Sequence, residues 1–154
     1  MAHTRQTIRE AAATILRTTP TNWAVVSESR IQSTRQVWPY LMVFAESSAD
    51  EGLTDTAPKA YNRDLTLTVV GLLKLPGSGD TQTVEDKMDA MAAEIETKLT
   101  TATLRAVVSG VKILSLLATS MDVIIEEDGI DHAELNMTWK VTYQTLEGLP
   151  EAFI

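Results

Sequence analysis

One short stretch gathers carboxylates and a histidine closely enough to bind a metal ion or to act in acid–base catalysis. The segment 126–134 contains five acidic residues and one of the two histidines of the chain. It lacks the twelve-residue ligand spacing of a calcium loop, and strand alternation would point neighbouring carboxylates to opposite faces. The sequence therefore favours a solvated hairpin turn built on Asp128-Gly129 over a ligand set. The candidate ligands are Glu126, Glu127, Asp128, Asp131, His132 and Glu134.

Two other kinds of reactive site have weak support in the sequence. In "LPGSGDTQTVEDK", Gly77 and Gly79 fit the first two glycines of a dinucleotide fingerprint, but Gln82 stands where the third should be. No Gly-x-Ser-x-Gly elbow and no cysteine is present, and His3 is near the N-terminus, which leaves His132 as the one candidate base. We expect no enzyme activity, no cofactor and no metal.

Composition limits the classes of protein further. The 154 residues fit one domain over 1–154, and a formal net charge of −8 disfavours an extended phosphate-binding surface. No run is apolar and long enough to cross a membrane, and "MAHTRQTIREAAATIL" carries charges where a signal peptide needs an apolar core. We therefore expect a protein that is cytosolic when made and does not bind membranes.

Two segments have the apolar period of helices. Residues 4–18 place Ile8, Ile15 and Leu16 on one stripe, with Thr4 as the expected N-cap. Residues 84–99 place apolar side chains three or four residues apart, and Glu85, Asp86 and Asp89 lie near the positive end of the helix dipole. The stripe of this second helix is Val84, Met88, Met91, Ile95 and Leu99.

The remaining apolar segments are typical of strands. They are "NWAVVSE", 41–46 after Pro39, 62–75 with apolar residues on both faces at its end, and 133–144, which alternates strictly. The run 103–120 fits a short helix or a buried strand, followed by a strand that begins near Ile113 or Met121. The sequence predicts an α+β fold in one domain, a mixed and mostly antiparallel sheet with two main helices on one face. We expect a long loop over 47–61 and a C-terminal tail over 146–154.

With these elements in order, the chain resembles the tail terminator proteins of long, flexible-tailed bacteriophages, the minor tail protein U family. The resemblance rests on "HTRQTIREAAATIL", "WPYLMVF", "RDLTLTVVGLLKLP", "VEDKMDAMAAEIETKL" and "ATSMDVIIEEDGIDHAELNMTWKVTYQ". It spans almost the whole chain but contains no invariant motif. It implies an α+β subunit that forms a hexameric ring on the tail tube, in the virion at the head–tail junction, after assembly in the host cytoplasm.

The resemblance also implies partners and contact surfaces. The partners would be five further copies, the tail tube protein and the head-side connector, while DNA passes through the ring without specific binding. The loop 47–61 would meet the tube, and Arg30 or Arg35 would meet a neighbour's acids. The apolar tail lies outside the resemblance, and its own residues favour docking on a neighbour or folding back on its own domain equally. Another neck or head-completion protein, and a small metal-dependent enzyme using 126–134, remain as alternatives. The expected interface residues are Arg30, Arg35, Asp50, Glu51, Leu53, Asp55, Glu126, Glu127, Asp128, Asp131 and Phe153.

Overall fold

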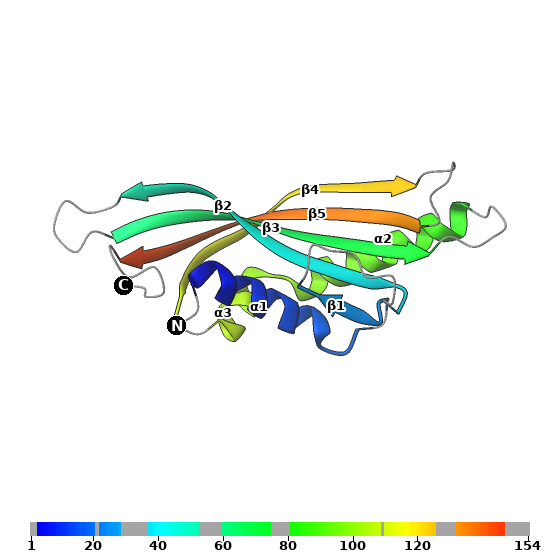
Figure 1. Cartoon of the computed structure of the whole chain (residues 1–154), viewed down its shortest axis with the longest axis horizontal. Helices are drawn as coiled ribbons and strands as arrows, with labels where there is room; N and C mark the ends of the chain where they lie inside the picture. Colours follow the sequence, from blue (N-terminus) through cyan, green and yellow to red (C-terminus); the bar gives the residue numbers. More distant parts are fainter. Residues whose placement is uncertain are drawn as a thin grey trace.

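A five-stranded sheet with three helices forms the molecule (Figure 1). The computed structural model describes residues 3–20, 22–28, 37–52, 60–74, 81–108, 110–125 and 132–146. The strand order is β1-β2-β3-β5-β4, in which β1 and β2 are parallel and the other pairs antiparallel. This confirms the predicted α+β class and the mixed, mostly antiparallel sheet. The elements are α1 (Thr4–Arg17), β1 (Val25–Ser27), β2 (Tyr40–Gly52), β3 (Ala60–Lys74), α2 (Thr81–Lys98), α3 (Thr101–Val107), β4 (Lys112–Ile125) and β5 (His132–Leu146).

The main core lies between the helices and one face of the sheet. Figure 1 shows the three helices on the same side of the strands. Strand alternation supplies the sheet's share of this core, and the pairing register aligns neighbouring strands, so that Leu67 lies between Ala45 and Trp139. The sheet residues of this core include Leu41, Val43, Ala45, Leu65, Leu67, Val69, Leu73, Ala133, Leu135, Met137, Trp139, Val141 and Tyr143.

A second, smaller apolar cluster lies on the other face of β2 and β3. Tyr40, Met42, Val70 and Leu72 are buried there, and Trp38 packs against them. The end of β3 is therefore apolar on both faces, as its sequence predicts. On the same face, β5 carries polar side chains that are partly buried, such as Asn136 and Thr138.

The first helix is anchored by its apolar stripe. Ile8, Ile15 and Leu16 are buried as predicted. The N-cap, however, is His3, whose Nδ1 accepts a hydrogen bond of 3.1 Å from the Arg5 amide. Thr4, expected as the cap, is the first helical residue and is itself buried. A histidine ring nitrogen can thus take the role that side-chain oxygens usually have at this position.

The second helix crosses the sheet closely at Gly71. All five residues of the predicted stripe are buried, including Met88 and Met91. A β-carbon added at Gly71 would lie 2.5 Å from the Met91 sulfur and 3.3 Å from Leu41 Cδ2. The absence of a side chain at this position therefore lets α2 and β3 pack together.

The run 103–120, which fits either a short helix or a strand, contains the end of a helix and the start of a strand. Thr100 and Thr103 form a capping box that starts the short helix α3. The strand β4 then begins at Lys112, close to the nearer of the two predicted starts, and pairs with β5 along its length.

The expected loop over 47–61 is shorter than predicted. Strand β2 continues to Gly52 and β3 begins at Ala60, with Gly52 paired with Tyr61. The prediction was wrong for these flanks because small polar residues have no apolar alternation, yet their backbones can still pair with a neighbouring strand. The pairing register shifts between Ser47 and Asp50, which marks a bulge where the strand signal is weakest.

Candidate functional site

Most of the predicted interface residues lie outside the described part of the chain. Asp50 and Glu51 lie within β2 and not in a loop, where they pair in register with Arg63 and Asn62 of β3. The suggested contact surfaces therefore stay predictions. The residues outside the described ranges are Arg30, Arg35, Leu53, Asp55, Glu126, Glu127, Asp128, Asp131 and Phe153.

Of the candidate metal ligands, the two described ones lie at the start of β5. His132 and Glu134 are two residues apart and so share one face of the strand. The His132 Nε2 atom lies 3.2 Å from Glu134 Oε1. The histidine ring also lies 5.9 Å from the Trp38 ring, which meets Tyr40 edge-on at 5.0 Å. These four side chains form the polar and aromatic border of the second apolar cluster.

The electrostatics of this border favour a neutral phenol. Burial raises the pKa of Tyr40 above its ordinary value, and the negative charge of Glu134 raises it further. Among the described residues, no group of three His, Asp or Glu side chains is placed to hold a metal ion. The contacts of His132 and Glu134 at this border suit packing of the strand end, and within the described ranges they bring two potential ligands together.

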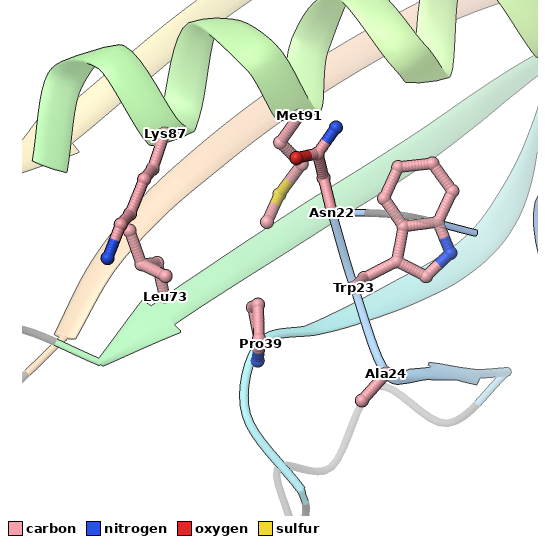
Figure 2. A pocket seen from close by; sticks show the side chains of 7 residues that line it. All are labelled: Asn22, Trp23, Ala24, Pro39, Leu73, Lys87 and Met91. Atoms are coloured by element: carbon pink, nitrogen blue, oxygen red, sulfur yellow. The ribbon is translucent and has the colours of Figure 1, made fainter.

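A pocket of about 380 Å³ opens between α2 and the segment before β1 (Figure 2). Its side chains are mainly apolar, and hydrogen bonds to backbone carbonyls fix two of them in place. Trp23 Nε1 donates to the Leu16 carbonyl at 2.9 Å, and Asn22 Nδ2 donates to the Ala90 carbonyl at 3.3 Å. Lys87 supplies the one charged group of its lining. The pocket has no acid–base pair and could accept an apolar side chain of another molecule. It is lined by Asn22, Trp23, Ala24, Pro39, Leu73, Lys87 and Met91.

The outer edge of β4 is covered along its first half. Arg105 of α3 donates from Nε to the Ile113 carbonyl at 2.9 Å and from Nη2 to the Leu114 carbonyl at 2.6 Å. The hydroxyl of Thr101 bonds to the backbone of Leu116, lying 3.3 Å from its nitrogen and 3.4 Å from its oxygen. Side chains of α3 thus supply hydrogen-bond partners to backbone groups in the first part of this sheet edge.

From Leu117 onward no element that the structure describes covers the edge of β4, and this stretch is called the open half of the edge. Apart from its ladder with β5 and the Thr119 and Ser120 hydroxyls that bond to Thr138, no described residue bonds to the stretch 117–124. Four of its side chains are large, apolar and exposed: Leu117 (61%), Met121 (49%), Val123 (38%) and Ile124 (41%).

The sequence alone does not reveal that this part of β4 lies at an open edge. Its signal is the run "LLATSMDVII", which has one charge in ten residues. A strand buried in the middle of a sheet gives the same run, so the sheet order is needed to place β4 at the edge.

Comparisons with known proteins give a match in structure alone. No protein-family model and no curated protein matches the sequence. Several solved chains are similar in structure, among them one from the "Virion of native gene transfer agent (GTA) particle". That chain is 12% identical with a TM-score of 0.46, and the match covers 93% of this chain and 96% of that one. A likeness of this size carries no inference about function. No helix in the described ranges combines the length and apolarity of a membrane span.

Proposed function

We propose that this chain is a structural virion protein that caps a phage tail tube. Six copies would form a ring on the last ring of the tube, stop its growth and offer the other ring face to the head-side connector. The proposed role is assembly and not catalysis, with the protein located in the virion at the head–tail junction.

The observation that carries the proposal is the order of the resembling stretches along the chain. The stretch "HTRQTIREAAATIL" falls on α1, "WPYLMVF" on the start of β2 and "RDLTLTVVGLLKLP" on β3. The acidic stretch "VEDKMDAMAAEIETKL" falls on α2, and the closing stretch covers most of β4 and β5. Each stretch thus corresponds to an element of the fold, in the order that the resemblance implies.

The acidity of the chain also supports a DNA conduit. Six copies would carry a formal charge of −48, six times the −8 of one chain. Any of this charge along the channel would repel DNA phosphates, so that the DNA passes without sticking.

The test is the length of tails in a phage that encodes this protein. Deleting the gene should give tubes that grow past their normal length, measured by electron microscopy. Normal tails in that mutant would refute tail capping, and tails of normal length that fail to join heads would favour another neck component.

The role of the segment between β2 and β3 can be tested separately. Strand β2 includes residues up to Gly52, so the replacement must be confined to 53–59 if both strands are to stay intact. A Gly-Ser segment of equal length should leave thermal unfolding unchanged and abolish capping. The matched control replaces 75–80, the segment that joins β3 to α2. If both variants cap tubes equally well, the segment 53–59 is not the tube contact.

The metal-dependent alternative makes a distinct prediction. A site around 126–134 would bind a divalent ion saturably and stabilise the fold by mass action. Calorimetry with Mg²⁺, Ca²⁺, Mn²⁺ and Zn²⁺ on the whole chain and on the Glu127→Gln, His132→Ala variant tests it. Saturable binding that the variant loses would favour the metal site over a purely structural role.

A further inference from the structure

We propose that the open half of the β4 edge, residues 117–124, binds the same edge of a second copy of this chain. Two β4 strands would pair antiparallel about a two-fold axis and join two five-stranded sheets into one. This inference does not rest on the proposed function.

The contrast between the two halves of the edge is the first argument. An exposed strand edge offers unpaired amide and carbonyl groups, and proteins usually block it with charges, proline or a covering element. Here Arg105 and Thr101 cover the edge as far as Leu116. From Leu117 to Ile124 the sequence contains no lysine, arginine or proline, and no described residue covers the edge. A bulge between Ala118 and Ser120 is the one interruption of the strand there. The open half is thus fit for pairing, and its boundary is set by α3.

The side chains of the open half give the second argument. Leu117, Met121, Val123 and Ile124 make up four of the six large apolar side chains exposed among the described residues. An edge that gained a partner strand would bring these side chains next to those of the partner on both faces of the sheet. Strand pairing would therefore bury apolar area and satisfy backbone groups in the same contact.

The stretch 117–124 is complementary to itself, and this points to a second copy as the partner. Each chain carries −8, so two copies repel over most of their surfaces. The stretch 117–124 contains a single charge, Asp122, so this repulsion is weak where the two strands would meet. Because the bulge between Ala118 and Ser120 adds one residue to the strand, an axis at Met121 makes the two Met121 residues face each other. It places Leu117 opposite Ile124, and Asp122 opposite the bulge at Thr119 and Ser120 of the other copy. The two Asp122 carboxylates then do not face each other.

A two-fold contact uses the same patch on both copies and cannot itself close a six-membered ring. Ring contacts would therefore use other surfaces. Loss of edge pairing and loss of tail capping are for this reason separate outcomes.

Sedimentation velocity of the whole chain over a range of concentrations tests the pairing. We expect a reversible dimer whose dissociation constant rises at least tenfold in Leu117→Lys and in Ile124→Lys. The matched controls are Val37→Lys and Val107→Lys, because Val37 is as exposed as Leu117 (61%) and Val107 (43%) is slightly more exposed than Ile124 (41%). Each control makes the same change in charge at a similarly exposed apolar side chain and should leave the constant within about twofold. Thermal unfolding of each variant confirms that it is folded.

Cysteine variants test the position of the axis. The chain has no cysteine, so a single introduced thiol can bond only to its copy. Under mild oxidation Met121→Cys, on the proposed axis, should form a disulfide-linked dimer, and Val37→Cys should not. A monomer at all concentrations would overturn the proposal. So would equal weakening by edge and control lysines, or an oligomer that the edge variants leave intact.

Discussion

At Gly71 a single missing side chain determines how closely α2 approaches the sheet. Substitution by alanine places a β-carbon 2.5 Å from the Met91 sulfur, so Met91 or the helix has to move. We expect Gly71→Ala to lower the free energy of unfolding by about 1–3 kcal/mol, the usual cost of overpacking a core. Urea denaturation of the purified protein measures it.

The matched control combines Gly71→Ala with Met91→Ala. Removing the methionine creates its own cavity but relieves the clash, so the double variant should lose less stability than the sum of the single variants. Additive losses would show that the Met91 sulfur is not what restricts residue 71.

The sequence predicts the burial and the capping role of some residues and not of others. Strict alternation in 133–144 predicts that Leu135 and Trp139 face the core, because a strand has only two faces and one is buried. The sequence does not predict that His3 caps α1, because capping depends on a ring orientation that composition does not reveal. It also does not predict that Met121 and Val123 are exposed, since burial of an apolar side chain depends on its position in the sheet.

Among the elements, the seven-residue helix α3 protects the start of the β4 edge. Its Arg105 guanidinium bonds to the Ile113 and Leu114 carbonyls and so covers the start of β4. We expect Arg105→Ala to cost about 1 kcal/mol of stability, because two hydrogen bonds from an exposed cation are lost to water. Hydrogen exchange should also become faster in the first half of β4.

Arg5→Ala is the control for that prediction, because it removes the same charge from the exposed surface of another helix. Equal exchange in β4 for both variants would mean that the α3 bonds do not restrain the strand edge.

Elements with an apolar period were predicted well, and polar ends of strands were not. The helix stripes of α1 and α2 follow from periodicity, which reflects burial against one face. The β2–β3 hairpin runs past Ser47 because each polar strand end has a partner in register, and a single strand's sequence does not reveal its partner.

For the whole molecule, the sign of the salt effect on association is a test of which surfaces meet. Two chains of −8 repel, and salt screens that repulsion, whereas apolar strand pairing needs no attraction between charges. We expect the dissociation constant of the dimer to fall several-fold between about 0.02 and 0.5 M NaCl, measured by sedimentation. A constant that rises with salt would indicate ion pairs, such as those expected from Arg30 and Arg35, in place of the β4 edge.

The position of β5 in the sheet has a consequence for the newly made chain. It follows the other four described strands in the sequence, yet it lies between β3 and β4 and pairs with both. Until the ribosome has released it, the β2–β3 hairpin lacks its inner neighbour and β4 has no partner strand at all. Pairings that span such long stretches of sequence form slowly, and unpaired strand edges aggregate readily. Production of this protein should therefore depend on translation speed and chaperone supply more than its final fold suggests.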